Sequence, residues 1–177
     1  MRRPCFHRPV VIAAAVVACA GFVASSAVVT AQRPIDQREL AEYRLTEPVY
    51  ERFAHGARLI VAASRKQPSL EEAPLFTRDT AVSGNAVEVA ALLLARLEQE
   101  PAFRTALFAA DIDAREFTLF ALALFGARLA HGLIQAGVIH VMPESVAGGN
   151  VAFVAARQVE IQALLAQMGI DQFTSKQ

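Results

Sequence analysis

Three polar residues interrupt the most apolar helix predicted in the chain, and they are the residues best placed to do chemistry. Arg128, His131 and Gln135 recur at spacings of three and four residues, which puts them on one side of that helix. A guanidinium, an imidazole and an amide could together bind the polar end of a ligand at the mouth of an apolar pocket. The same residues could instead form the rim of ordinary helix packing, bonded to a neighbouring helix. They are the candidate ligand-binding residues.

Glu51 and His55 stand one helical turn apart, so both side chains fall on the same side of a predicted helix. A carboxylate beside an imidazole can ligate zinc or iron, or transfer protons as an acid/base pair. A di-iron bundle needs Glu-x-x-His spacing on two helices, and that spacing does not occur in the sequence. The G-x-S-x-G motif of one large hydrolase class does not occur either. We expect no catalytic residue, no metal and no cofactor.

Residues 1–31 have the three parts of an export signal: a basic opening, an apolar run and a small-residue exit at Ser25, Ser26 and Ala27. The triplet Val29-Thr30-Ala31 then suits signal peptidase. We expect cleavage after Ala31. Two alternatives stay open, because Cys19 ends a stretch that fits a lipobox and could carry a lipid anchor, and because an uncleaved segment is nearly long enough to span a bilayer. All three place the rest of the chain outside the cytoplasm, in the periplasm or secreted.

The composition of the exported part excludes several function classes. The whole chain balances 17 basic against 17 acidic residues, and removal of the three arginines of the signal leaves 14 against 17, a net charge of −3. A nucleic-acid partner is therefore not expected, because it requires a basic face. Cys5 and Cys19 both lie in the signal, so the remainder has no disulfide, thiolate nucleophile or cysteine metal ligand.

The pattern of apolar residues, caps and prolines predicts an all-α, single-domain bundle of about five helices around a central apolar helix. We expect a tether over 32–45 that becomes helical near Gln37, a bundle domain over 46–169 and a fraying tail over 170–177. Within the bundle domain, the expected helices are 46–67, 85–98, 101–110, 113–137 and 150–169. A long loop is expected over 67–84. A loop of that length is uncommon unless it is functional or mobile.

The central helix, 113–137, is predicted to be surrounded in its first half. Asp113 and Glu116 have capping-box spacing, and between 117 and 127 only Thr118 is polar. Gly137 is placed to end the helix in a left-handed conformation. A membrane span is the competing interpretation, but a span needs about 20 largely apolar residues, and the three candidate binding residues interrupt that window.

The last helix is predicted to begin at Asn150 as its N-cap and to end at Gly169. The preceding Gly148-Gly149 pair could bind an anion through exposed amides, although helix capping alone accounts for it.

Three stretches carry a resemblance: YRLT at 43–46, DIDAREF at 111–117 and NVAFV at 150–154. With them, most of the exported part resembles a family of small exported bacterial all-helical proteins of uncharacterised activity. The shared motifs are capping and packing elements, so the resemblance implies fold and export and transfers no activity, cofactor or site residue.

These observations favour a non-enzymatic binding or interaction module of the cell envelope. The alternative is a carrier of small apolar ligands, with a pocket between the central and last helices and the three candidate binding residues at its mouth. An enzyme of unknown class is the third possibility. The expected partner is a protein or a small apolar ligand, with membrane attachment only through an uncleaved signal or a lipid at Cys19.

Overall fold

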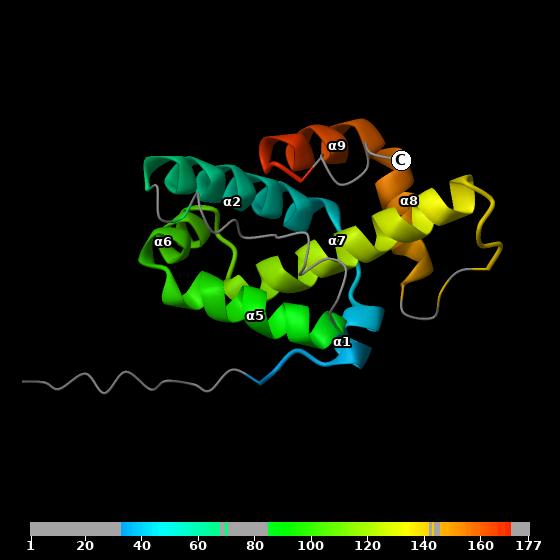
Figure 1. The fold of residues 1–177 in the computed structure, drawn as a ribbon, viewed down its shortest axis with the longest axis horizontal. Helices are drawn as coiled ribbons and strands as arrows, with labels where there is room; N and C mark the ends of the chain where they lie inside the picture. Colours follow the sequence, from blue (N-terminus) through cyan, green and yellow to red (C-terminus); the bar gives the residue numbers. More distant parts are fainter. Residues whose placement is uncertain (1–32, 68–69, 71–84, 142, 144–145, 171–177) are drawn as a thin grey trace, which may run out of the picture. The chain divides into compact units, whose positions relative to one another are not determined.

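The computed structural model describes residues 33–67, 70, 85–141, 143 and 146–170, and these form seven α-helices and no strand (Figure 1). The helices are α1 (Gln37–Glu42), α2 (Glu47–Lys66), α5 (Ala86–Gln99), α6 (Pro101–Ala109), α7 (Ala114–Gln135), α8 (Gly148–Ala156) and α9 (Gln158–Gln167). The prediction of an all-α bundle is confirmed for this part of the chain. The export segment, nearly all of the loop predicted at 67–84 and the tail beyond Ile170 lie outside the described residues.

Side-chain oxygens explain why three of the helices begin where they do. Asp36, Asn85 and Asp113 each accept a hydrogen bond from a backbone N–H two or three residues further on, at 2.8, 3.2 and 2.7 Å. The second half of the capping box predicted at Asp113 is wrong, because the carboxylate of Glu116 does not return to that amide. It accepts from Nη2 of Arg52 on α2, at 3.0 and 3.1 Å.

Glycine ends α7 and α9 in the predicted way. Gly137 has φ +69°, and Val138 donates its N–H to the carbonyl of Leu133 at 2.9 Å. Gly169 has φ +74°, and Ile170 donates to Leu165 at 3.0 Å. In both cases the bond satisfies a carbonyl that the end of the helix would leave without a partner, in the Schellman arrangement. This arrangement requires a residue that adopts positive φ without strain.

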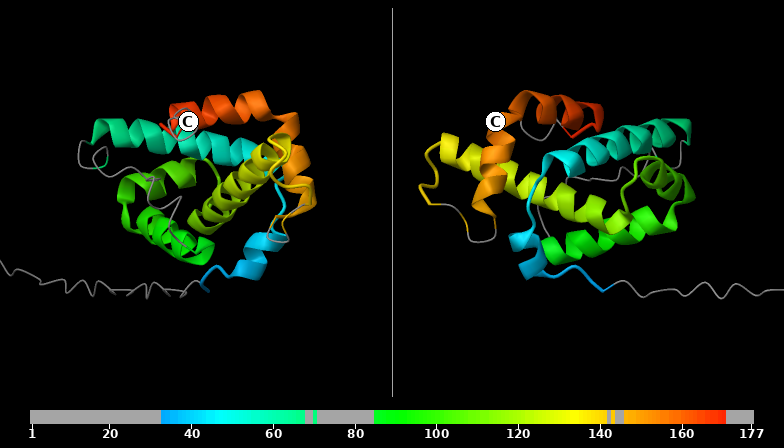
Figure 2. Two further views of the ribbon diagram at one scale, coloured as in Figure 1. Left: turned by 45° about the vertical axis from the view of Figure 1, so that its right-hand side comes forward. Right: turned by 180° about the vertical axis from the view of Figure 1, so that it is seen from behind.

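The core lies between α2 and the first half of α7. Phe53 of α2 stacks on Phe117 and Phe120 of α7 with ring centroids 4.6 and 4.8 Å apart, and all three are buried. Helices α6 and α9 pack against α2, while α5 and α8 pack against α7 (Figures 1 and 2). The prediction that residues 117–127 sit inside the bundle is confirmed for most of them, but Leu122, Phe125 and Gly126 are only partly buried.

The last helix is two helices, which corrects the prediction of one from Asn150 to Gly169. Ala147, not Asn150, precedes the first helical residue, and Arg157 breaks the path between α8 and α9 with φ −123° and ψ 25°. The side chain of Arg157 forms an ion pair with Glu47 and lies 4.5 Å above the ring of Phe153. The break allows α8 to pack on α7 and α9 to pack on α2.

The segment expected to be a tether packs on the bundle within its described part. Its helix, α1, begins at Gln37 as predicted. Ile35 is buried in a small second cluster with Ala90 and Leu94 of α5 and Leu119 of α7. Burial of an isoleucine stabilises by about 1.5–3 kcal/mol relative to exposure, which favours the contact of this segment with α5 and α7.

Candidate functional site

The side chain of Asn150 connects α8 to the segment between α1 and α2. It lies inside the first turn of α8 and is 2% exposed. Its Oδ1 accepts from the N–H of Leu45 at 2.9 Å, and its Nδ2 donates to the carbonyl of Tyr43 at 2.8 Å. Both groups lie in the extended link between α1 and α2, which has no helical partner for them. The side-chain amide therefore stabilises the contact between this link and α8, and it is not the N-cap that we predicted.

The surroundings of Tyr43 form a closed polar cluster. Burial, and secondarily the carboxylate of Glu116, raises the pKa of Tyr43 to about 12. Its ring meets Phe120 edge to face at 6.4 Å. Arg52 bonds Glu116 through Nη2, while its buried Nε has no hydrogen-bond partner among the described residues. A phenol with a raised pKa beside a paired carboxylate is a poor proton donor at neutral pH, so this cluster supports packing more than catalysis.

An open depression of about 340 Å³ lies beside α1, and its lining is entirely charged. The lining residues are Arg33, Asp36, Arg38, Glu39, Glu42 and Arg115. Each acid is held by an arginine: Asp36 by Arg33 at 3.1 Å, Glu42 by Arg38 at 2.8 Å and Glu39 by Arg115 at 2.5 Å. Because every carboxylate is already paired, the depression offers no free base for catalysis.

A second open depression, of about 320 Å³, lies on α6, where it is lined by Pro101, Arg104, Thr105 and Phe108.

The pair Glu51 and His55 lies exposed on α2. Within the described ranges, no group of three or more histidine, cysteine or acidic side chains is close enough to hold a metal ion.

The structure places the three predicted binding residues on the second half of α7. Arg128 and His131 are partly buried and Gln135 is exposed. No side-chain hydrogen bond or ion pair joins any of them to another described residue, so the helix-to-helix bond that we considered for His131 is not formed. Neither depression described above includes them. The contact between α7 and α8, where the carrier alternative places its pocket, contains the buried side chains of Val151 and Val154.

Next to this polar stripe lies a surface that the sequence did not reveal. Leu129 and Leu133 are four residues apart on α7, and Val138, Ile139 and Val141 follow its end. We call these five residues the distal apolar face. Leu129, Val138 and Val141 are 65%, 66% and 80% exposed, and the other two are partly buried. The N–H groups of Val138 and Ile139 both bond the carbonyl of Leu133, which holds the post-helix segment against the last turn.

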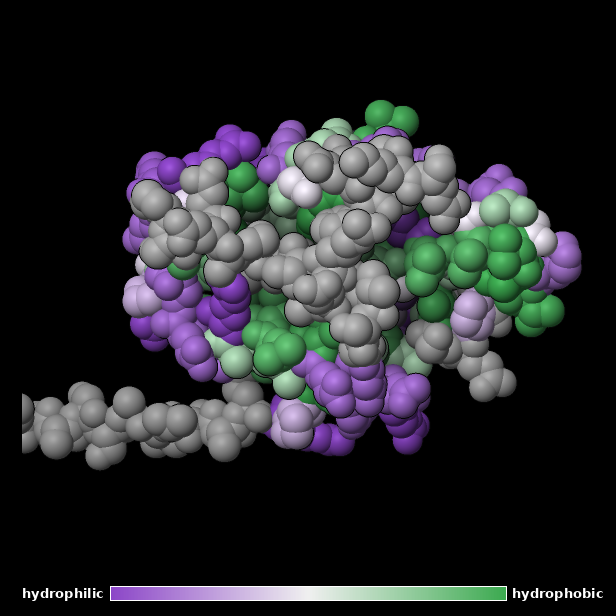
Figure 3. Space-filling model, in the orientation of Figure 1, coloured by the Kyte–Doolittle hydropathy of each residue, from purple (hydrophilic) through white to green (hydrophobic). Residues whose placement is uncertain are grey.

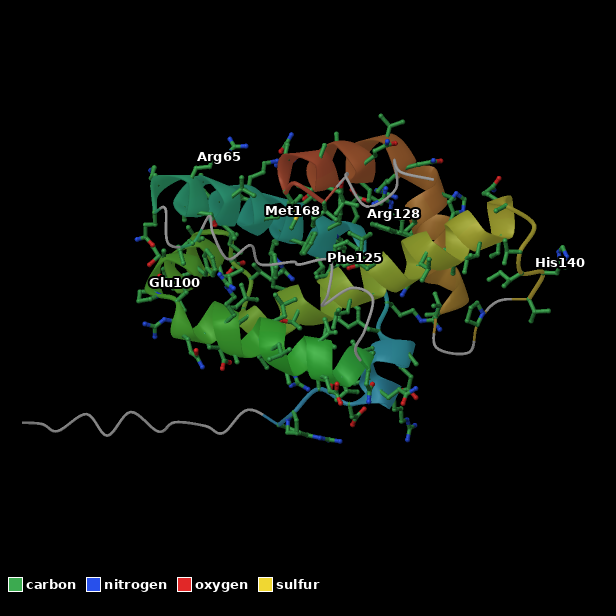
Figure 4. The ribbon with its side chains drawn as sticks, in the orientation of Figure 1. Arg65, Glu100, Phe125, Arg128, His140 and Met168 are labelled. Carbon is green, nitrogen blue, oxygen red and sulfur yellow. The ribbon has the colours of Figure 1, made fainter. Side chains whose placement is uncertain are left out.

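The distal apolar face lies where α7 leaves the bundle. The C-terminal end of α7 extends beyond α2 and α5, with α8 beside it (Figures 1 and 2). Hydrophobic residues gather over this end of α7 in the space-filling view (Figure 3). His140 lies at the far end and Arg128 is set back along the helix (Figure 4). The first half of the helix is thus buried in the core, whereas the second half keeps one side against the bundle and presents another to its surroundings.

Along the stretch of sequence that carries this face, the described charged residues are basic. From Phe117 to Val159 the described residues include Arg128, His131, His140 and Arg157 and no acid. The single acid of that stretch in the sequence, Glu144, lies outside the described residues. Arg157 is paired with Glu47, so Arg128 is the cation of this region without an ion-pair partner among the described residues.

By length and composition alone, α7 is the one helix of the described chain that could cross a membrane, and 44% of its most apolar stretch is buried in the bundle. The core helix of a soluble protein passes the same test. The buried part belongs to the aromatic core with α2, so the apolar part open to the surroundings is the distal half.

No protein-family model, curated protein or solved structure matches the chain. The site must therefore be interpreted from its own geometry.

Proposed function

We propose that this chain is a non-enzymatic binding module of the cell envelope, exported by its N-terminal segment, and that it binds through the distal apolar face. The observation that carries the proposal is the concentration of exposed aliphatic side chains at one end of α7. Among the described residues, six large hydrophobic side chains are exposed. Three of them belong to this face, whereas Leu92, Phe108 and Val159 lie on three other helices. Scattered exposed hydrophobic residues are ordinary, but a contiguous group marks an interaction surface.

The arrangement favours binding over catalysis because the groups near the face are poorly suited to chemistry. Arg128 is a permanent cation, His131 and His140 have no carboxylate partner among the described residues, and Gln135 does not titrate. A general base requires an orienting partner and a place for a substrate within hydrogen-bond reach. A rigid helix end with aliphatic side chains instead provides a preorganised apolar surface.

Site-specific photo-cross-linking in the exporting cell tests the proposal. The full chain is made with a photoreactive amino acid in place of Leu129, and the matched control carries it in place of Leu92, which is 63% exposed on α5. We expect adducts with a component of the envelope, protein or lipid, from position 129 and few or none from position 92. Equal adducts at both positions, or none at 129, would contradict the proposal. The comparison holds whether the N-terminal segment is cleaved, lipidated or retained.

A further inference from the structure

Resting on the proposed function, the geometry points to the occupant of the distal apolar face: the surface of a lipid bilayer with anionic headgroups. We propose that Leu129, Leu133 and the valines at 138 and 141 enter the boundary between headgroups and acyl chains. Arg128 then lies at the level of the phosphates, with His131 beside it. The module lies on the membrane through the side and end of α7 and does not span it.

The order of side chains around α7 fits an interfacial helix. Ala123, Ala127 and Ala130 face the bundle and are buried. The polar stripe of Arg128 and His131 comes next around the helix, and the exposed leucine side lies beyond it. A helix that rests in the membrane interface needs an apolar side flanked by cationic residues. The second half of α7 provides both while its remaining side stays fixed to α8.

The charge of the region favours an anionic surface. The described residues from 117 to 159 carry cations and no acid, although the exported part as a whole has a net charge of −3. The acids are thus concentrated on other parts of the chain. A basic group near an anionic lipid surface strengthens binding, and an acid there would weaken it.

The same charge pattern argues against a second copy of this chain as the occupant. A two-fold dimer brings a surface against itself, so each residue of the face meets residues of the same face. Two copies joined here would bring two Arg128 side chains into one interface, with no described acid of the face to neutralise either one. A lipid surface supplies the missing negative charge.

The end of α7 is also suited to an apolar environment because carbonyls of its last turn accept backbone hydrogen bonds. The carbonyls of Leu133 and Ile134 accept the N–H groups of Val138 and Gly137. An unpaired backbone group is costly away from water, so a helix end can approach hydrocarbon only when such bonds are closed. The exposed valines follow directly after this closed turn.

The chain contains no tryptophan, so a single introduced tryptophan reports its own surroundings. The protein is prepared in the processed form that its host produces, with Leu129→Trp in one sample. The matched control carries Leu92→Trp. Each is titrated with vesicles of phosphatidylglycerol and phosphatidylcholine, and with vesicles of phosphatidylcholine alone. We expect the emission of the tryptophan at 129 to shift to shorter wavelength with the anionic vesicles and that of the tryptophan at 92 to stay unchanged.

Two further variants test the roles of individual residues. In the Leu129→Trp background, Val141→Asp is expected to weaken binding to anionic vesicles by about tenfold, while Val159→Asp, which changes an equally exposed valine on α9, leaves it unchanged. Arg128→Gln is expected to weaken it about fivefold.

The inference is overturned if the tryptophan at 129 does not shift with anionic vesicles, or shifts equally with neutral ones. In the first case, a cross-link from position 129 to an envelope protein would still leave the proposed function standing, with a protein as the partner. A stable dimer in sedimentation experiments that is lost in Leu129→Asp would overturn the inference in favour of a second copy.

Discussion

The amide of Asn150 makes one buried and one partly buried hydrogen bond to backbone more than a hundred residues away in sequence. Its replacement in Asn150→Ala leaves the N–H of Leu45 and the carbonyl of Tyr43 without partners. Each unsatisfied buried group costs about 1–3 kcal/mol, so we expect the free energy of unfolding to fall by roughly 2–4 kcal/mol. Urea denaturation of the variant measures this loss. Gln135→Ala, at an exposed position without a bond to a described residue, serves as the control and should change stability by less than about 0.5 kcal/mol.

Tyr43 should titrate far above free tyrosine. Its pKa of about 12 lies above the unfolded value of 10.0, because burial disfavours the phenolate. The stabilisation from the neutral buried ring is therefore complete below about pH 10 and is lost as the pH rises from about 10 to about 12. Phenolate absorbance during alkaline titration measures this directly. Tyr43→Phe should remove the later transition and leave that of Tyr50, the other tyrosine, whose pKa burial also raises.

At the residue scale, the sequence predicted local bonds well and long-range ones poorly. The cap at Asp113 and the turn at Gly137 depend on neighbours within a few residues, and both are formed. Glu116 was expected to close a local box, but Arg52 lies close enough to offer a charged donor. Both bonds would use the charged carboxylate, but the guanidinium also carries the opposite charge and contacts both carboxylate oxygens, so the distant arginine is favoured over the nearby amide.

At the scale of elements, α7 carries a graded burial that substitutions can map. Phe120 is fully buried in the aromatic core, so Phe120→Asp should unfold the domain, because an unpaired buried charge costs several kcal/mol against a total stability of about 5–15 kcal/mol. Leu122, two residues further along α7, is only partly buried and should tolerate the same substitution better. Thermal melting followed by circular dichroism distinguishes the two positions: Phe120→Asp shows no folded baseline, and Leu122→Asp melts cooperatively below the parent.

An equally low melting temperature for both variants would contradict this graded burial. Apolar periodicity could not have predicted the difference, because both residues are apolar and α7 is apolar on nearly every side of its first half. Which apolar side meets another helix depends on tertiary packing.

The break between α8 and α9 also depends on tertiary packing. Arg157 has an ordinary helix propensity, and it leaves the helix where it meets Glu47 and Phe153.

At the scale of the whole molecule, export is a prediction from residues 1–31. The N-terminal segment should be cleaved after Ala31, so that the mature chain begins at Gln32. The intact mass of protein recovered from the envelope of the exporting cell measures this. A mass that corresponds to a lipid-modified chain beginning at Cys19, or to the full chain, would instead support one of the two alternatives for the anchor. Recovery only from the cytoplasm would contradict export in any form.

The fold class and five of the helix starts could be predicted from the sequence, because capping residues, prolines and apolar spacing act locally. The distal apolar face could not. The sequence shows that Leu129 and Leu133 share one side of a helix, but it does not show that the bundle ends before reaching them. The candidate binding residues Arg128, His131 and Gln135 were chosen because polar residues stand out on an apolar helix, and the exposed aliphatic residues beside them did not stand out.

The melting temperature of Leu129→Asp in purified protein tests the central claim most directly, which is that the second half of α7 is open for a partner. If Leu129 faces solvent in the free protein, the substitution changes the free energy of unfolding by no more than about 0.5 kcal/mol, as at an ordinary surface position. The melting temperature should then match that of Leu92→Asp and of the parent chain. A loss of several kcal/mol at position 129 alone would show that the chain already covers this face, and would contradict the account.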